Sequence, residues 1–202
     1  MRGAAKALGG TLNTSFITAV AHAAGTYHRE MGAPVESLRA SMAISTRNES
    51  SGSNAFTLAR MLVPTADMPI AERFSAINEI LVAARTGAES SSLEALATIS
   101  GVVPTSIITR LARSQAETVD FATSNVRSAG VPLFMAGSQL LENYPVGPLG
   151  GVAFNVTLMS YMGSLDCGIN IDEAAVESPT LLRDSLSQAF TELSAFAPER
   201  EN

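Results

Sequence analysis

The chain has 202 residues, of which 46% are hydrophobic and 16% are charged. This composition excludes an intrinsically disordered chain and allows a sizeable hydrophobic core. The formal net charge is −6 at pH 7, and the 13 Lys and Arg residues are scattered along the chain. The charge therefore argues against a nucleic-acid partner, because phosphate binding needs a basic surface.

The periodicity of apolar residues and the positions of Gly and Pro predict alternating helices and strands. The first half of the chain is predicted to contain a helix over 15–29, strands over 37–45 and 55–64 around a polar loop at 46–54, and a helix after Pro69. Helices over 90–100 and 104–119 and a short strand over 120–125 follow. The last part is predicted to contain an edge or bent segment over 131–139, a hairpin within 151–171 and a final helix over 179–195.

Two of these predictions rest on particularly clear signals. The first helix has Asn13 or Thr14 as its expected N-cap, and a glycine and a proline follow its end. Apolar and polar residues alternate on both sides of Gly163, which predicts a hairpin that turns there. Long helices combined with hairpin pairing indicate one α+β domain over residues 1–202, with a mixed β-sheet and flanking helices.

The cellular compartment is predicted from the single cysteine and from the lengths of the apolar runs. Cys167 has no second cysteine to pair with, which fits a reducing compartment. No apolar run approaches the roughly 20 residues of a membrane-spanning helix, and polar residues at 13–15 break the apolar centre that a signal peptide needs. We therefore expect a cytoplasmic protein.

The two histidines do not form a recognisable catalytic or metal-binding pattern. His22 and His28 are six residues apart, which on a helix places their side chains about 120° apart, so they do not easily share a metal ion or relay one proton. We expect His22 to be a packed or half-exposed helix residue and His28 to be solvated.

The remaining reactive side chains also give no catalytic or metal site. Cys167 alternates with apolar residues and is expected to face the core as a small hydrophobic residue. Asp166 and the acids at 172–173 are expected to be isolated and solvated. No catalytic residue and no metal ligand set is therefore predicted.

Polar residues inside predicted strands are more informative. Ser124 and Asn125 end one strand, and Asn155 lies in the middle of another, where asparagine is disfavoured. Each of them either satisfies a local turn or bulge, or lines a polar spot in an otherwise apolar cavity. Both interpretations stay open on the local pattern.

Four segments together resemble a known enzyme family. They are AAKALGGTLNTSFITAVAHAAGTYHREMG at 4–32, LRASMAISTR at 38–47, ATSNVRSAGVPLFMAGSQLLENYPVGPL at 122–149 and FNVTLMSYMGSLDCGINID at 154–172. Their order and spacing are similar to those of the C-terminal half of bacterial wax ester synthase/diacylglycerol acyltransferases. These enzymes belong to the wider chloramphenicol acetyltransferase-like fold of CoA-dependent acyltransferases.

The resemblance implies two similar halves that face each other across a tunnel, in which acyl-CoA meets an alcohol or diacylglycerol. The family's general base is a histidine of an H-H-x-x-x-D-G motif on the N-terminal half, and this sequence does not contain that motif. Two further departures are Thr14, where the family usually has an aspartate, and residues 127–130, where it tends to have Pro-Gly-Pro.

The first hypothesis is therefore the C-terminal domain or subunit of a long-chain O-acyltransferase. Acyl-CoA would be its co-substrate with no resident cofactor, and an N-terminal acyltransferase half would supply the histidine. The expected substrate-binding residues, which face the tunnel, are Asn13, Ser124, Asn125, Asn155 and Ser160. Peripheral contact with a membrane or with lipid bodies is a further expectation.

The alternative is a non-catalytic module that binds lipid or oligomerises. An isolated half exposes the apolar face that would otherwise meet its partner half, and such a face favours a homodimer or a scaffold. A degenerate, inactive gene product is the third hypothesis.

Overall fold

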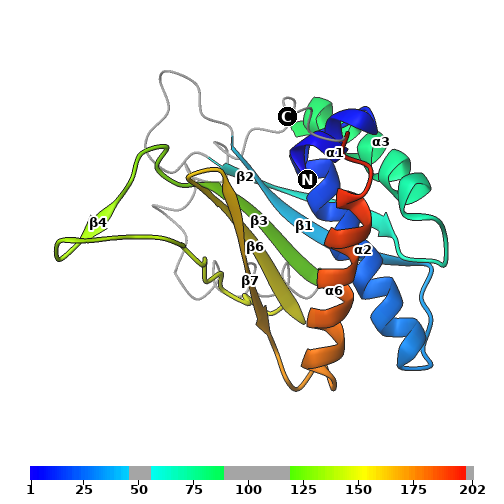
Figure 1. Cartoon of the computed structure of the whole chain (residues 1–202). Coiled ribbons are helices and arrows are strands. Elements are labelled where there is room, and N and C mark those ends of the chain that lie inside the picture. The colour runs from blue at the N-terminus through cyan, green and yellow to red at the C-terminus, as the bar shows by residue number, and fades with distance from the viewer. Residues whose placement is uncertain (46–55, 89–118, 199–202) are drawn as a thin grey trace, which may run out of the picture.

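The structure is a computed structural model that describes residues 1–45, 56–88 and 119–198 (Figure 1). Its elements are α1 (Arg2–Ala7), α2 (Leu12–Glu30), β1 (Ser37–Ser45), β2 (Phe56–Pro64), α3 (Ile70–Ala88), β3 (Phe121–Arg127), β4 (Phe134–Met135), β5 (Ser138–Gln139), β6 (Phe154–Tyr161), β7 (Ser164–Ile171) and α6 (Pro179–Ser194). The predicted loop 46–54 and the predicted helices 90–100 and 104–119 lie outside the described residues, apart from Val119.

Five strands form one mixed sheet in the order β2-β1-β3-β6-β7. The two outer pairs, β1–β2 and β6–β7, are antiparallel, whereas the inner pairs β1–β3 and β3–β6 are parallel. The predicted hairpin is confirmed, with Tyr161 paired to Ser164 and a turn at Gly163. The α+β class with a mixed sheet and flanking helices is likewise confirmed.

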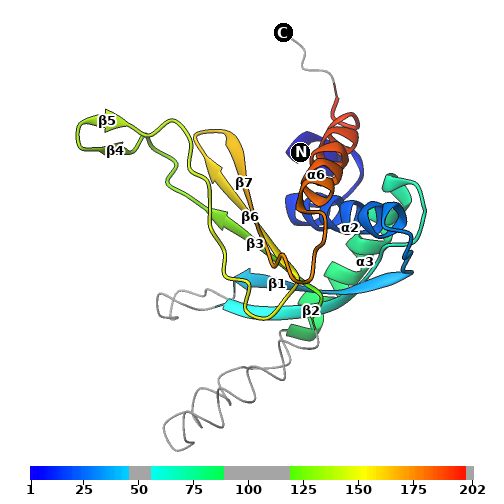
Figure 2. The same ribbon diagram turned by 90° about the horizontal axis from the view of Figure 1, so that it is seen from below.

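The helices α2, α3 and α6 cover one face of this sheet, as the view from below shows (Figure 2). Alternate residues of β6 point toward them, and Phe154, Val156 and Leu158 belong to the buried core. The rings of Phe121 and Phe154 on neighbouring strands stack with their centroids 5.1 Å apart. We call this side the helix face of the sheet.

Small side chains allow α2 to lie at the centre of the helical layer. Its buried residues include three alanines after Val20 and before Tyr27, together with Gly25. A Cβ atom on Gly25 would lie 2.2 Å from the carbonyl oxygen of Thr65, so α2 and the end of β2 touch backbone to backbone. Only glycine permits this approach.

The predicted cap of α2 is wrong, because the helix begins at Leu12 with Thr11 as its N-cap. The Thr11 hydroxyl accepts the N–H of Thr14 at 3.2 Å, and the Thr11 N–H donates to the Thr14 hydroxyl at 3.2 Å. This reciprocal capping box satisfies two backbone donors at once. With Asn13 as the N-cap, the hydrogen-bonding side chains of Thr11 and Thr14 would not cap the helix. Asn13 is thereby released from capping.

The opposite face of the β6–β7 hairpin is covered by the chain itself. Residues 142–150, which we call the return segment, run back along β7, with Asn143 bonded to Asp166 near the hairpin turn and Gly147 bonded to Asn170 near the other end. A Cβ on Gly168 would lie 1.8 Å from the carbonyl oxygen of Pro145, which shows how closely this segment approaches β7. The side chain of Asn170 donates to the carbonyl of Gly147 at 2.7 Å and holds the segment in place.

The segment predicted as an edge or bent piece is a projecting ribbon. Residues 131–141, which we call the arm, contain β4 and β5 as a pair of two-residue strands. The arm turns at Ala136 and Gly137, whose φ angles are 50° and 84°. In both views it extends away from the sheet and from the helices (Figures 1 and 2).

Candidate functional site

The candidate site lies where the first turn of α2 meets the end of β3. Asn125 is register-paired with Leu158, so its side chain points to the helix face of the sheet. There its Nδ2 donates to Oδ1 of Asn13 at 2.6 Å, across a sequence separation of 112 residues. Both side chains are half-buried. The structure thus brings two of the five predicted site residues into direct contact.

A second pair of polar side chains supports this corner. The Thr14 hydroxyl donates to Oδ1 of Asn78 on α3 at 3.0 Å, which ties the start of α2 to the neighbouring helix. A Cβ on Gly10 would lie 2.6 Å from the Phe74 ring, so the chain approaches α3 closely just before α2. The corner is therefore built from three elements that hold Asn13 in one position.

The chemistry available at this corner is uncharged. Asn13, Thr14, Asn78 and Asn125 carry amides and hydroxyls, and the first turn of α2 contains no acidic residue. The helix N-terminus contributes a partial positive charge. Such a corner orients and hydrogen-bonds a carbonyl or hydroxyl group, but it has no group that takes up a proton at neutral pH.

The other three predicted site residues lie elsewhere on the sheet. Ser160 has the parity of Leu158 and so points to the helix face, beside Arg127 in the register. Ser124 and Asn155 point to the opposite face. Asn155 donates to the carbonyl of Pro148 at 2.9 Å, so it supports the return segment. Substrate contact by any of these residues stays a prediction.

The prediction that Asp166 is a solvated acid is wrong. Its side chain is buried, and Oδ2 accepts the backbone N–H of Asn143 at 2.7 Å while Oδ1 accepts the Ser164 hydroxyl at 3.2 Å. The local pattern did not reveal this role, because the return segment reaches Asp166 from 23 residues away in sequence.

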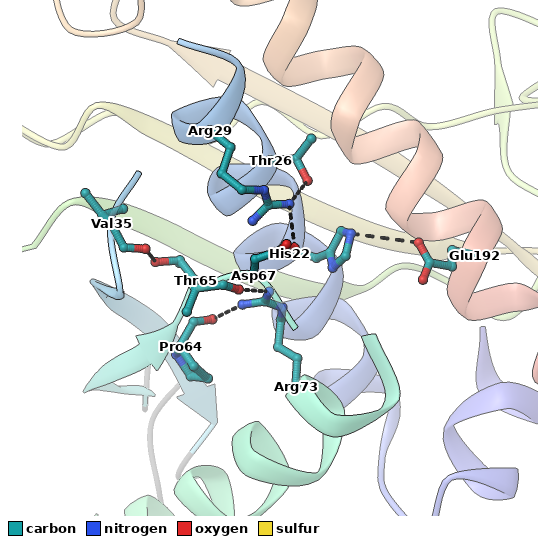
Figure 3. Close-up of polar contacts among 10 residues, drawn as sticks. His22, Thr26, Arg29, Val35, Pro64, Thr65, Asp67, Arg73 and Glu192 are labelled. Carbon is teal, nitrogen blue, oxygen red and sulfur yellow. Dashed lines mark hydrogen bonds and ion pairs between the residues drawn. The ribbon is translucent and has the colours of Figure 1, made fainter. Parts of the chain in front are cut away.

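A second polar cluster lies between α2, α3 and α6 (Figure 3). Its ionisable members are His22, Arg29, Asp67, Arg73 and Glu192. Arg73 is fully buried and donates to the carbonyls of Pro64 and Ala66 at the end of β2. Burial and the nearby charge of Arg29 lower the pKa of Arg73 to about 10, so it still carries its charge at neutral pH.

His22 is the histidine of this cluster, and its side chain is 17% exposed. Its Nε2 lies 3.8 Å from Oε2 of Glu192, and its Nδ1 has no hydrogen-bond partner among the residues that the structure describes. Burial, and after it the charge of Arg73, lowers the pKa of His22, while Glu192 opposes the shift. The ring is therefore neutral at pH 7.

The position of His22 separates it from the candidate site. His22 lies nine positions after Asn13 on α2, which corresponds to about 13 Å along the helix. No proton passes directly over that distance. The cluster instead fastens α3 and the end of β2 to the helical layer, and the prediction that His22 is a packed or half-exposed helix residue is confirmed.

Neither a nucleophilic cysteine nor a metal centre is found in the part of the chain that the structure describes. Cys167 packs against the core from the helix face, and burial raises the pKa of its thiol to about 11. Residues 1–45, 56–88 and 119–198 contain no group of three or more side chains suited to hold a metal ion. Within the same ranges, none of the helices combines the length and apolar character needed to cross a membrane.

The architecture is one half of the fold shared by CoA-dependent acyltransferases and condensation domains. The wax ester synthase/diacylglycerol acyltransferase from Marinobacter aquaeolei VT8 matches with a TM-score of 0.72 and 24% identity, over 98% of this chain and 46% of that one. A condensation domain of the enacyloxin polyketide synthase matches with a TM-score of 0.57 and 14% identity, over 98% of this chain and 38% of that one. At these identities the likeness shows the fold alone.

The sequence places the chain within this class. The family described as the WS/DGAT C-terminal domain matches residues 52–194, and the chain belongs to that family. Two Mycobacterium tuberculosis proteins, from strains CDC 1551 and H37Rv, bear names that mark them as candidate diacylglycerol O-acyltransferases. Each is 28% identical to this chain over 201 residues, covering 96% of this chain and 40% of the relative. The chain therefore spans less than half the length of these relatives.

Proposed function

We propose that the chain provides the C-terminal half of a long-chain O-acyltransferase, which transfers an acyl group from acyl-CoA to an alcohol or diacylglycerol. The observation that carries this proposal is the match of residues 52–194 to the WS/DGAT C-terminal domain. The Asn13–Asn125 pair supports it, because the contact sets two uncharged polar groups beside the N-terminus of α2.

In the proposed reaction a histidine of the other half takes the proton from the acceptor hydroxyl. The hydroxyl oxygen then forms a bond to the thioester carbonyl carbon, the carbon–sulfur bond breaks, and the proton passes to the departing CoA sulfur. The carbonyl oxygen gains negative charge during this step. The amide of Asn13, released from capping, is suited to stabilise that charge or to orient the acceptor hydroxyl.

The test is co-expression of this chain with an acyltransferase half that carries H-H-x-x-x-D-G, followed by an assay with palmitoyl-CoA and hexadecanol. We expect ester only when both halves are present. Asn13→Ala should lower the rate about 10- to 100-fold, because it removes a hydrogen bond of about 1.5–3 kcal/mol to developing charge. Asn125→Ala should also lower the rate, because it removes the donor that holds the Asn13 side chain in place.

Asn170→Ala is the matched control, since it makes the same chemical change at the return segment rather than at the candidate site. It should leave the rate within about threefold of the unsubstituted chain. If this chain alone formed ester and His22→Ala abolished that activity, the general base would lie within this chain. This result would contradict the proposal that the other half supplies the base.

A non-catalytic interaction module is the second candidate, and the exposed apolar arm favours it. Large apolar surface that meets water tends to be covered by a partner. In this case co-expression should yield no ester, while the chain still self-associates or binds hydrophobic dyes. A strict monomer by sedimentation that binds no such dye contradicts this candidate.

A further inference from the structure

The first turn of α2 is anchored at two points that face different neighbours. Asn13 faces β3, where its Oδ1 accepts the side-chain N–H of Asn125 at 2.6 Å. The next residue, Thr14, is turned by about 100° around the helix axis and faces α3, where its hydroxyl donates to Oδ1 of Asn78 at 3.0 Å. Two anchors at this angle oppose rotation of the first turn about the helix axis.

The Asn13 side chain depends on this anchoring. Among the residues that the structure describes, Asn125 provides its only side-chain hydrogen bond. Asn13 is half-buried, and the N-cap residue Thr11 is exposed, so packing alone does not fix this end of the helix. The direction of the Asn13 amide therefore follows the rotation of the first turn.

The hydroxyl of Thr14 makes a set of bonds in which Asn78 supplies the tie to α3. It accepts the N–H of Thr11 at 3.2 Å and lies 3.0 Å from the Thr11 hydroxyl, in addition to its bond to Asn78. Without an acceptor at Asn78, the Thr14 hydroxyl can donate to that of Thr11 instead, and the capping box stays intact. Asn78 therefore matters more for the direction of the turn than for the stability of the helix.

Asn78 is itself held in place on α3, which lies beside α2 in the helical layer (Figure 2). It directly follows Ile77 and lies one turn after Phe74, and both of these side chains are fully buried. A Cβ on Gly10 would lie 2.6 Å from the Phe74 ring and 2.9 Å from Oδ1 of Asn78, so the chain just before α2 lies against both side chains. The Asn78 oxygen is thus fixed between the backbone at Gly10 and the Thr14 hydroxyl.

We propose that Asn78 is a positioning residue of the candidate site, which acts through Thr14 to direct the Asn13 amide toward the reacting thioester carbonyl. This inference rests on the proposed function, in which Asn13 contacts the substrate and Asn78 does not. It makes α3 a part of the reaction machinery, because the orientation of a group at the site is set by a side chain on that helix.

The kinetic test compares variants of Asn78 in the two co-expressed halves, assayed with palmitoyl-CoA and hexadecanol. Asn78→Leu keeps the approximate size of the side chain but removes the acceptor. It should lower kcat about 10-fold and leave KM within about twofold, because it misdirects Asn13 without removing a ground-state substrate contact. Asn78→Asp keeps the acceptor oxygen and should hold kcat within about threefold of the unsubstituted chain.

Two further variants separate positioning from general stability. Thr14→Val should act like Asn78→Leu, and the two combined should lower kcat no more than about twofold beyond either alone, because they remove the same bond. Thr157→Val is the matched control, since Thr157 is also buried and donates to the Oδ1 of an asparagine, Asn155, at 2.9 Å, on the opposite face of the sheet. It should leave kcat within about twofold.

A spectroscopic measurement on this chain alone tests the inference without ester formation. The Asn125 side-chain amide donates a proton to Asn13, so this proton should exchange slowly with solvent in NMR spectra, and its absence from Asn125→Ala assigns the signal. In Asn78→Leu and Thr14→Val its exchange should be at least about 10-fold faster. Asn78→Asp and Thr157→Val should leave its exchange unchanged.

Several results overturn the inference. They are an unaltered kcat in Asn78→Leu, a loss of kcat that Asn78→Asp shares, or an unaltered exchange of the Asn125 proton in Asn78→Leu. An equal loss of kcat in Thr157→Val and Thr14→Val also contradicts it, because reduced stability would then explain both. If the unsubstituted halves form no ester, the proposed function fails, and the exchange of the Asn125 proton alone decides whether Asn78 positions Asn13.

Discussion

Replacing Gly25 by alanine should destabilise the protein, although alanine is the better helix former. The new Cβ would lie 2.2 Å from the carbonyl oxygen of Thr65. That carbonyl has little freedom to retreat, because the Thr65 N–H donates to Glu36 and its hydroxyl donates to Val35, both at 2.9 Å. The carbonyls on either side of Thr65 accept hydrogen bonds from the buried Arg73 (Figure 3).

The expected magnitude follows from two opposing effects. Inserting a methyl group into a packed site costs about 1–3 kcal/mol, and glycine to alanine in a helix interior gains about 1 kcal/mol. The obstacle at Gly25 is backbone held by several hydrogen bonds rather than a flexible side chain, so the upper end of the cost applies. We expect the free energy of unfolding to fall by about 2 kcal/mol.

Equilibrium unfolding in urea, followed by circular dichroism, measures this loss. With an m-value of about 2 kcal/mol/M, the midpoint should fall by about 1 M. Gly3→Ala is the matched control, because Gly3 is also helical and its Cβ would lie 3.4 Å from the Ala197 side chain. Its free energy of unfolding should stay unchanged or rise by up to about 1 kcal/mol. A Gly25→Ala variant as stable as the unsubstituted chain would refute the assigned backbone contact.

Three further outcomes are expected. Arg73→Lys should lower the free energy of unfolding by about 1–3 kcal/mol in the same urea assay, because one ammonium cannot reach both the Pro64 and Ala66 carbonyls. A decrease of less than about 0.5 kcal/mol would contradict this. The stability contributed by neutral His22 should be fully present above its unfolded pKa of about 6.5 and be lost as the pH falls through its lower folded pKa. His22→Gln should therefore flatten the pH dependence of stability below about pH 6.5, and curves that stay parallel argue against it. At pH 8, Cys167 of the folded protein should react with Ellman's reagent about 100-fold more slowly than a free thiol, because burial raises its pKa to about 11. In denaturant it should react at the rate of a free thiol. A rapid reaction of the folded protein would contradict the burial of Cys167.

Much of the secondary structure was predictable because the relevant signals are local. The strand at 37–45 and the hairpin around Gly163 appear where the alternation of apolar residues placed them. The last helix, Pro179–Ser194, follows from its apolar spacing and from the proline at its start. The cap of α2 was misplaced by two or three residues, because the sequence around Asn13 offers several competing capping side chains.

The candidate site was predictable only in part. Asn13 and Asn125 were both proposed as polar site residues, but their contact joins residues 112 positions apart. Asn155, proposed with them, lies on the opposite face, where it supports the return segment. Arg73 was not singled out at all, since an arginine within an amphipathic helix normally points to solvent.

The sequence by itself determined the helices α2, α3 and α6, the strands of the five-stranded sheet, the α+β class and the family resemblance, because side-chain periodicity and the order of motifs are properties of the linear chain. The short helix α1 was not predicted. Only the tertiary structure decided which polar residues meet, that Asp166 and Arg73 are buried, and that residues 131–141 project as an arm. The reason is that these features depend on strand order. The parallel pairs β1–β3 and β3–β6 join distant segments, and local patterns do not encode which strands become neighbours.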